Sequence, residues 1–535
     1  MMSTARPLTR ENVNAMLREV DLALQGQNMV GAVSAAERAL DAGIEHPLLL
    51  ALVAEQRRQT GWTLEAVNLA ERARALAPRE PQVLTVLAEC LSAIGREAEA
   101  IEQLEAAVAA EPRYAPAWLT KARLHETRGE MAEAARAYEQ AFEAEPRLAD
   151  AAAKRAWLAA RAGEGETARG WGARALGASP TSVTARLALI QADVLDGRYQ
   201  GALAAAQQLN ESTGLSSSNQ ALVQGLIADA LDGLERTAEA FEAYRRSNDI
   251  FRQQYAGEVA MAAPVSPAET VRRMSAWFEA SEPWPKPEVE AEDGEPATHV
   301  FLLGFPRSGV GAVEQALRAQ PGVATLAHRN TFVSAIETYL DPDGGLQRLA
   351  VLDAEEAARL RRSYFEEVRR LGGDLSRPVF VDQLPLNSLA LPLVARLFPH
   401  AKVLITRRDP RDVVLSCYRS RFPVTPLTFQ FLDLQSAADL FDASMQLNDA
   451  YLRRLPLDVR AVVYEELARD PRRFGQGLGE YLGVEWSAGA VPGGDEKAAA
   501  GVGRWRRYEQ ELAPVLPALE PWVRRFGYAT EGGEG

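Results

Sequence analysis

The chain has 535 residues, more than one hydrophobic core usually serves, so two or more domains are expected. Hydrophobic residues make up 47% and charged residues 25%, as in globular proteins, and the net charge of -14 argues against nucleic-acid binding through overall charge. The two cysteines lie far apart, the N-terminus lacks an apolar signal core, and no apolar run approaches the ~20 residues of a membrane span. We therefore expect a cytoplasmic protein with no disulfide framework, membrane span or nucleic-acid partner.

Residues 1–255 are rich in alanine and leucine and repeat with a period of 34 residues. In a helix–turn–helix unit of this length, a small residue lets the paired helices approach, and a proline stops the second helix. The pattern resembles the tetratricopeptide repeat (TPR) and predicts an all-α solenoid, whose concave surface can hold a protein or peptide partner. The recurring residues are Gly61, Gly95, Gly129, Gly163 and Gly197; Ala66, Ala100, Ala134, Ala168 and Ala202; and Pro78, Pro112, Pro146 and Pro180.

Residues 256–297 are interpreted as a linker. Several prolines and the acidic tract EVEAEDGE favour an extended, solvated chain at its two ends. Between them, VRRMSAWFEA predicts one short amphipathic helix that packs Val271, Met274 and Phe278 against a neighbour.

Residues 298–535 open with a strand, a glycine-rich turn and a helix, in the sequence THVFLLGFPRSGVGAVEQ. Backbone N–H groups and the helix dipole converge where such a turn meets a helix, so we expect an anion site there. Gly304 and Gly309 have the spacing of half a Walker A motif, but the Lys and Ser or Thr that hold Mg-ATP do not follow. Arg307 is the only cation of the turn and Ser308 its only hydroxyl. The turn predicts a site for a phosphate-like group and disfavours an NTPase or a kinase.

Three further apolar runs, at 378–382, 401–406 and 460–464, alternate with helical segments. This alternation predicts a parallel sheet covered by helices on both faces, a three-layer α/β/α domain. Ligands of such sheets bind at the carboxyl ends of the strands. Four polar side chains follow strands and are expected at that edge: Arg307, Gln383, Arg408 and Tyr464.

Five motifs occur in order: GFPRSGVGAVEQAL, VDQLPLN, LFPHAKVLITRRDPRDVVLSCY, VVYEEL and GVGRWRRYEQEL. Together with the repeats, they resemble the bacterial TPR-linked sulfotransferases, whose domain is P-loop NTPase-like and whose sulfuryl donor is 3′-phosphoadenosine-5′-phosphosulfate (PAPS). The resemblance implies transfer of a sulfuryl group from PAPS to a hydroxyl or amine, without a metal. It leaves open whether the acceptor is a small molecule, a sugar or a peptide.

The resemblance also implies roles for individual residues. The first arginine of RDPRD, Arg408, and the serine eight residues later, Ser416, are expected at the 3′-phosphate, and Tyr464 near the adenine. Arg504 and Trp505 are expected to close over the nucleotide. Arg411 and Asp412 are interpreted as structural, an ion pair and a helix cap. The loop residues expected to cradle the 5′-phosphosulfate are Pro306, Arg307, Ser308, Gly309, Val310 and Gly311.

The chain departs from the family pattern at three places. Val310 and Gly311 replace two loop threonines, and Gln383 replaces a lysine that is aimed at the transferred group. A neutral amide donates a hydrogen bond but does not neutralise developing charge, and loss of such a donor costs ~100 to 1000-fold in rate. His328 stands closest to the position of the catalytic glutamate. It is interpreted as a general base, with a surface histidine or a remnant of a lost site as the alternatives.

The leading hypothesis is therefore a PAPS-dependent sulfotransferase in which Arg307, Gln383 and His328 carry the chemistry. The alternative is a catalytically impaired PAPS-binding or protein-interaction protein on the same fold.

Overall fold

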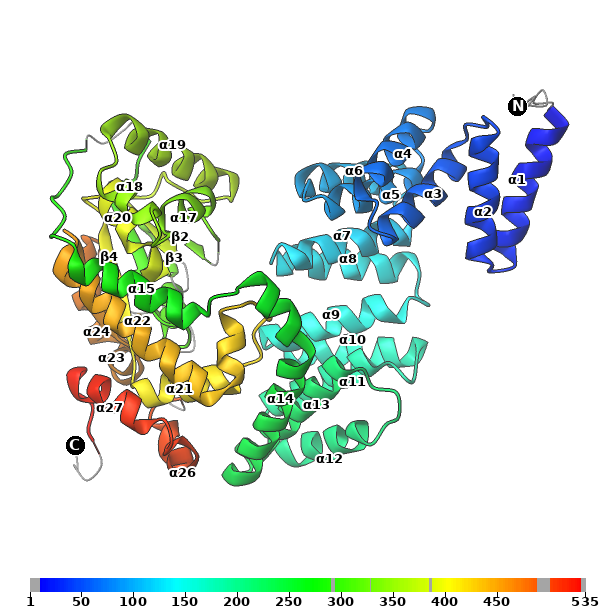
Figure 1. The fold of residues 1–535 in the computed structure, drawn as a ribbon. Coiled ribbons are helices and arrows are strands. Elements are labelled where there is room, and N and C mark those ends of the chain that lie inside the picture. Colours follow the sequence, from blue (N-terminus) through cyan, green and yellow to red (C-terminus); the bar gives the residue numbers. More distant parts are fainter. Residues whose placement is uncertain (1–9, 290–293, 328, 384–386, 488–500, 531–535) are drawn as a thin grey trace. The chain divides into compact units, whose positions relative to one another are not determined.

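The computed structural model describes residues 10–289, 294–327, 329–383, 387–487 and 501–530 (Figure 1). The chain forms two compact units, Met1–Gly214 and Leu215–Gly535. The predicted boundary at residue 255 falls inside a helix of the second unit, so this unit contains more than the α/β domain. None of the helices within the described ranges is both long and apolar enough to cross a membrane.

The first unit is an array of helix pairs. Its glycines at the 34-residue period have φ near +80°, for example 87° at Gly61 and 79° at Gly95, and form the turn within each pair. This left-handed conformation favours glycine and explains why the residue recurs. The periodic alanines from Ala66 to Ala202 are all fully buried, so a larger side chain there would overpack the helix contact.

The periodic prolines follow the second helix of each pair, directly after its C-cap residue, as the sequence predicts. The helices of the first unit are α1 (Arg10–Gln25), α2 (Met29–Asp41), α3 (Pro47–Gln59), α4 (Thr63–Leu76), α5 (Pro81–Ala93), α6 (Glu97–Ala110), α7 (Ala115–Thr127), α8 (Met131–Ala144), α9 (Ala149–Ala162), α10 (Gly165–Ala178), α11 (Val183–Leu195) and α12 (Tyr199–Asn210).

The second unit begins with three helices. A helix pair, α13 (Ser217–Gly233) and α14 (Thr237–Ala262), is followed by α15 (Pro267–Ala280). Helix α15 lies in the segment interpreted as a linker and buries Val271, Met274 and Phe278 in the main core of the unit. Much of the segment interpreted as a linker therefore packs against the core of the second unit.

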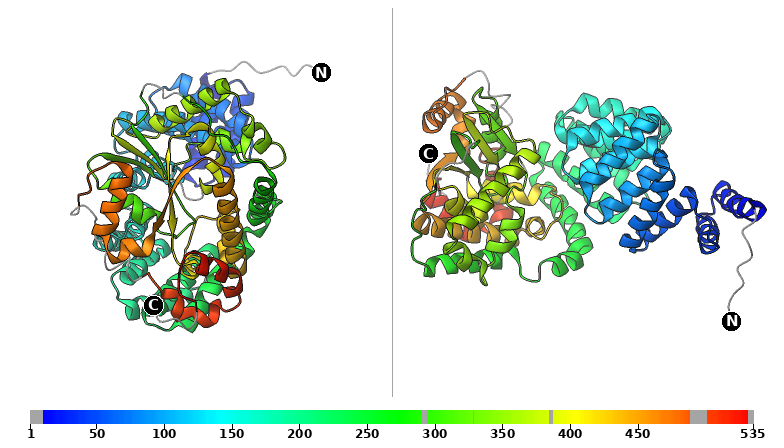
Figure 2. Two further views of the ribbon diagram at one scale, coloured as in Figure 1. Left: turned by 90° about the vertical axis from the view of Figure 1, so that its left-hand side faces the viewer. Right: turned by 90° about the horizontal axis from the view of Figure 1, so that it is seen from above.

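A five-stranded parallel sheet in the order β2-β3-β1-β4-β5 organises the rest of the second unit. Two apolar clusters cover its faces: one includes α16 and α24, the other α15, α19, α20 and α22. Figure 2 shows the strands between α22 and α24 in its left view. The strands are β1 (Thr298–Leu303), β2 (Val323–Ala327), β3 (Val379–Gln383), β4 (Lys402–Arg407) and β5 (Asp458–Val463).

The register aligns the strand ends that carry the predicted site. Leu302 of β1 lies opposite Gln383 of β3, and Leu303 lies opposite Ile405 of β4. The remaining elements are α16 (Val310–Arg318), α17 (Val333–Tyr339), α18 (Gly345–Ala350), α19 (Ala354–Arg370), η1 (Asn387–Ala390), α20 (Leu391–Leu397), α21 (Pro410–Arg419), η2 (Thr428–Leu432), α22 (Leu434–Arg454), α23 (Tyr464–Arg469), α24 (Pro471–Leu482), η3 (Arg504–Tyr508), α26 (Glu509–Leu512) and α27 (Leu516–Arg525).

Candidate nucleotide site

The loop between β1 and α16 is tightly built. A Cβ atom on Gly304 would lie 2.0 Å from Oγ1 of Thr406, and one on Gly309 would lie 2.5 Å from the ring of Tyr464, so neither position accepts a side chain. The Ser308 hydroxyl is buried, donates to the Phe305 carbonyl over 2.6 Å and lies 2.6 Å from the Thr406 hydroxyl. Ser308 therefore uses its side chain to hold the loop.

Backbone amides at the start of α16 form the helix N-terminus that closes this loop. Ala312 and Val313 are the first helical residues to donate within the helix, and both donate to the Gly309 carbonyl. Val310 and Gly311 precede them at the first turn, where N–H groups have no intrahelical acceptor. The helix dipole adds partial positive charge at this end. Val310 and Gly311 lack hydroxyl groups but contribute these amides to the loop.

Arg307 extends from the loop to a second element of the site. Its φ of 69° is unusual for a residue with a side chain, and such strain is concentrated at functional sites. Its Nε donates to the Ser416 hydroxyl of α21 over 2.9 Å. The side chain keeps an exposed face, but surrounding protein atoms displace water from the guanidinium and lower the pKa of Arg307, and nearby Arg408 and Arg419 lower it further. An anion would relieve this crowding of positive charge.

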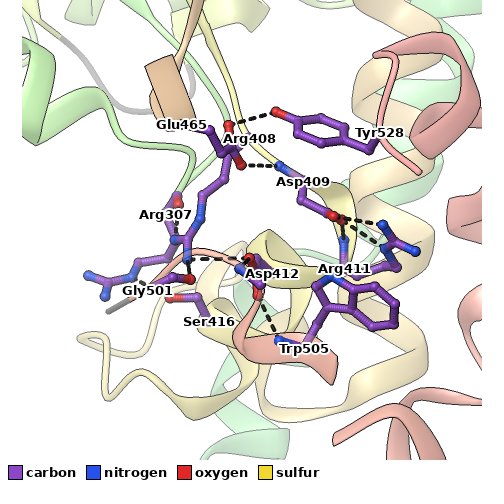
Figure 3. A network of polar contacts seen from close by, with 11 residues as sticks. Arg307, Arg408, Asp409, Arg411, Asp412, Ser416, Glu465, Gly501, Trp505 and Tyr528 are labelled. Carbon is purple, nitrogen blue, oxygen red and sulfur yellow. Dashed lines mark hydrogen bonds and ion pairs between the residues drawn. The ribbon is translucent and has the colours of Figure 1, made fainter. Parts of the chain in front are cut away.

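Arg408 joins the loop to the end of β4 (Figure 3). Its Nη1 donates to the Arg307 carbonyl over 3.0 Å, and its Nη2 donates to the Gly501 carbonyl. The guanidinium carbon lies 5.0 Å from the centre of the Tyr464 ring, which also packs beneath Gly309. The structure thus brings together three predicted site residues that follow strands, Arg307, Arg408 and Tyr464, with a fourth, Ser416, from α21.

Acidic side chains behind Arg408 fix the surrounding segments. Asp412 accepts the backbone N–H groups of Gly503 over 2.6 Å and Trp505 over 2.8 Å. Burial raises the pKa of Asp412 to about 6, although Arg408, 4.0 Å away, favours its charged form. Asp412 therefore anchors the segment from Gly501 to Tyr508, called the late segment below. The prediction that Asp412 is a helix cap is wrong.

The cap of α21 is Asp409, which also forms the ion pair predicted for Arg411. Asp409 accepts the Arg411 backbone N–H over 3.0 Å and receives its guanidinium through two bonds of 2.9 and 2.8 Å. Glu465 accepts the Asp409 N–H and the Tyr528 hydroxyl. A sequence pattern offers no signal for Glu465 and Tyr528, because their partners lie far away along the chain.

Gln383 lies at the end of β3 and is 1% exposed. Within the described part of the chain, neither its amide nitrogen nor its amide oxygen has a hydrogen-bond partner. The neighbouring Asp382 accepts from Thr331 over 2.8 Å and from Tyr364 over 2.7 Å, and burial raises its pKa to about 6. His328, the predicted base, lies outside the described residues.

The late segment contacts the site mainly through its backbone. Trp505 is buried, with the Arg411 guanidinium 3.6 Å from its ring centre, and Arg504 lies 3.6 Å from Asp232 of α13. The predicted contact of these two side chains with a nucleotide stays a prediction. Among the described residues, no group of three or more His, Cys, Asp or Glu side chains is placed to hold a metal ion.

The parallel sheet, with the Arg307 loop directly after its central strand β1, defines an α/β domain of the P-loop type. Residues 299–488 match the model of the sulfotransferase family, and residues 61–124 and 115–148 match models of the tetratricopeptide repeat. The chain therefore combines tetratricopeptide repeats with a sulfotransferase-family domain.

Two curated relatives share part of the chain. A protein of Aquifex aeolicus (strain VF5), named "Uncharacterized protein", is 25% identical over 254 residues, which are 42% of this chain and 33% of that protein. A Caenorhabditis briggsae protein named "Putative protein-tyrosine sulfotransferase" is 25% identical over 194 residues, 35% of this chain and 66% of that protein. The chain thus spans about a third of the first relative and 66% of the second.

Solved structures similar to this chain include two repeat proteins. A thermophilic TPR protein of Thermus thermophilus is 24% identical, with a TM-score of 0.29, over 34% of this chain and 98% of that one. YrrB, described as a TPR protein with an unusual peptide-binding site, is 16% identical, with a TM-score of 0.29, over 34% of this chain and 91% of that one.

Proposed function

We propose that this chain transfers a sulfuryl group from PAPS to an acceptor hydroxyl or amine. The observation that carries the proposal is the grouping of Arg307, Arg408 and Ser416 around an amide-lined loop that lacks the lysine of a nucleoside triphosphatase. A donor with phosphate groups at both its 3′ and 5′ positions matches two adjacent sets of donors, the loop amides with Arg307 and the pair Arg408 and Ser416. The match to the sulfotransferase family supports the same assignment.

The two sets of donors have different tasks in the proposed complex. The amides of Val310 and Gly311, with Arg307, would hold the 5′-phosphosulfate, and Arg408 and Ser416 would hold the 3′-phosphate. Arg307 and Ser416 already share a hydrogen bond, so the two phosphate positions would be linked. Fixing both ends of the donor orients its sulfur for in-line attack, which supplies much of the rate of such a transfer.

In the proposed reaction the acceptor oxygen or nitrogen attacks sulfur and forms the new bond. The bond between sulfur and the bridging oxygen breaks, and its electron pair leaves with adenosine 3′,5′-bisphosphate. A base takes the acceptor proton, and we propose His328 for this role. Arg307 would stabilise the charge that develops on the leaving phosphate.

Gln383 would supply one hydrogen bond to the transferred group. Its buried amide without a partner in the described part of the chain supports this role, because such a group is costly unless a ligand satisfies it. An amide carries no charge, so transition-state stabilisation would be weaker than with lysine. The same residue therefore favours the second candidate, a protein that binds the nucleotide but transfers slowly or not at all.

We propose that acceptor and partner are recognised outside the nucleotide loop. The name of the Caenorhabditis briggsae relative makes a tyrosine hydroxyl in a peptide the first acceptor to test, beside sugars and small molecules. The repeat array is the proposed site for a protein or peptide partner. The two described cysteines, Cys90 and Cys417, are free and buried, which supports a reducing compartment such as the cytoplasm.

The test is a mass-spectrometric screen of the full chain with PAPS and a pool of tyrosine peptides, sugars and small hydroxyl or amino compounds. The proposal predicts a sulfated product together with one equivalent of adenosine 3′,5′-bisphosphate. Binding of the bisphosphate without any product would favour the second candidate. Absence of both binding and product would exclude both.

A further inference from the structure

Asp232, near the end of α13, is a buried carboxylate that joins two distant segments. One oxygen accepts Nη2 of Arg419 over 2.5 Å, and the other accepts the Tyr508 hydroxyl over 2.6 Å. Arg507 lies 3.4 Å and Arg504 3.6 Å from the same carboxylate, and Arg507 also donates to the Asp232 carbonyl over 2.7 Å. One negative charge thus stands among three guanidinium groups that would otherwise repel each other.

The surrounding contacts are specific and buried. Asp229, one turn before Asp232, pairs with Arg421 over 2.7 Å and accepts the Tyr244 hydroxyl of α14 over 2.7 Å. Gly225 faces Arg421 so closely that a Cβ atom would lie 2.8 Å from its guanidinium. Burial works against the charge of Arg419, but Tyr244 and Asp232 raise its pKa above the ordinary value. The α13–α14 pair is therefore fitted to the end of α21.

Both segments held by Asp232 lead to the nucleotide site. Arg419 ends α21, one turn beyond Ser416, whose hydroxyl accepts from Arg307. The segment from Gly501 to Tyr508 includes the carbonyl that accepts from Arg408 and the two amides bound by Asp412 (Figure 3). Asp232 itself contacts neither Arg307 nor Arg408 among its described interactions.

We propose that Asp232 is a positioning residue of the nucleotide site, which makes the last helix pair of the repeat region part of that site. By neutralising Arg419 and Arg507, it fixes the end of α21, which carries Ser416, and the segment whose Gly501 carbonyl accepts from Arg408. Because Arg408 and Ser416 are the residues assigned to the 3′-phosphate, Asp232 determines selectivity for a nucleotide carrying that group. This inference rests on the proposed nucleotide site, and it holds whether or not transfer occurs.

The test compares two ligands in the full chain by calorimetric titration. Asp232→Asn should weaken adenosine 3′,5′-bisphosphate binding ~10-fold or more, and adenosine 5′-monophosphate binding by less than ~2-fold. The matched control is Asp249→Asn, a half-buried acid of α14 that pairs with Arg245 over 3.1 Å, and it should change neither affinity. Equal losses for both ligands, or no loss for either, would overturn the inference.

Tyr508→Phe gives a milder version if Asp232→Asn does not fold. It removes only the hydroxyl that donates to Asp232, and it should give a smaller loss, ~3-fold, with the same preference for the bisphosphate. In the Ser416→Ala background the loss from either variant should shrink, because the side chain that α21 positions is gone. An undiminished loss would contradict action through Ser416.

Hydrogen exchange separates this inference from the proposed function. Without ligand, Asp232→Asn or Tyr508→Phe should speed exchange in the last turn of α21 and in residues 501–508 relative to the wild type. If the wild type binds no bisphosphate, the proposed function fails, and this comparison still decides the positioning role. Unchanged exchange in both segments would overturn it.

Discussion

The two sides of the candidate site differ in charge. On the nucleotide side, which comprises Arg307, Arg408, Ser416 and Tyr464, cationic and hydroxyl groups contact one another across strand ends. On the transfer side, Gln383 is neutral, buried and without a partner among the described residues. The first side carries the cationic groups that the proposed donor needs, whereas the second carries a neutral amide where a cation would stabilise the charge of the proposed transfer. Binding and turnover should therefore respond to different substitutions.

The largest expected effect is on the transfer side. His328→Ala should lower the transfer rate ~100 to 10,000-fold, because the acceptor proton loses its base. Bisphosphate affinity should stay within ~2-fold, since the proposed base acts on the acceptor and not on the nucleotide. Wild-type turnover should rise with pH through ~6.5, where the imidazole becomes neutral and able to take a proton.

Initial rates across about pH 5 to pH 8 measure this effect, with the exposed His400→Ala as the matched control. A His328→Ala variant as active as the wild type would show that another group takes the proton. The transfer side would then have to contain a different residue as its base.

Gln383→Lys should increase the transfer rate, by up to ~100-fold, because a cation stabilises charge that develops only in the transition state. Gln383→Met has a similar length without a hydrogen-bonding group and should slow transfer. Single-turnover rates at saturating PAPS separate this effect from binding. A lysine variant that is folded and no faster would show that the transfer side does not lack charge.

Asp382→Asn should change how stability depends on pH. Burial raises the pKa of Asp382 to about 6 from an ordinary 3.8, so the folded chain binds this proton more tightly than the unfolded chain. The wild type should therefore lose ~3 kcal/mol of unfolding free energy between about pH 4 and pH 6, and no more above that range. The asparagine variant lacks this loss.

Urea unfolding of both proteins across this pH range measures the difference. Stability of the variant relative to the wild type should rise between about pH 4 and pH 6 and then level off. A difference that is constant with pH would contradict the assignment of a buried, titrating carboxyl beside Gln383.

The smallest effect is expected from deleting the first compact unit. A chain of residues 215–535 retains α13, Asp232 and the complete candidate site, so its bisphosphate affinity should stay within ~3-fold of the full chain. A chain that starts at Val265 lacks Asp232 and should bind much more weakly. Equal affinity of the two truncated chains would show that α13 and α14 do not contribute to the site.

Local patterns predicted much of the fold. The 34-residue period reflects a glycine with positive φ in each turn and a buried alanine at each helix contact, both of which are local requirements. The strand, turn and helix around Arg307 were predicted for the same reason. Strand β2 was missed, because Val323–Ala327 is short and lies close after a helix.

Tertiary contacts explain what the sequence did not reveal. The helix pair α13–α14 was counted with the repeat array, but Asp229 and Asp232 bind arginines ~190 residues away along the chain, and no periodicity records such pairs. Similarly, Arg411 pairs with Asp409 and not Asp412, because the α21 cap brings Asp409 to its guanidinium. The sequence placed the residues that follow strands at the carboxyl edge of the sheet, but it did not reveal their hydrogen-bond and ion-pair partners.

The central claim, a nucleotide side built for a 3′,5′-bisphosphate, is tested most directly by calorimetric titration without magnesium. The wild type should bind adenosine 3′,5′-bisphosphate, and Arg408→Met should weaken this binding ~100-fold, because charge-assisted hydrogen bonds to phosphate are lost. Arg407→Met, whose guanidinium lies 4.9 Å from the Phe526 ring centre, is the matched control and should bind normally. Tighter binding of Mg-ATP than of the bisphosphate, or normal binding by Arg408→Met, would contradict the claim.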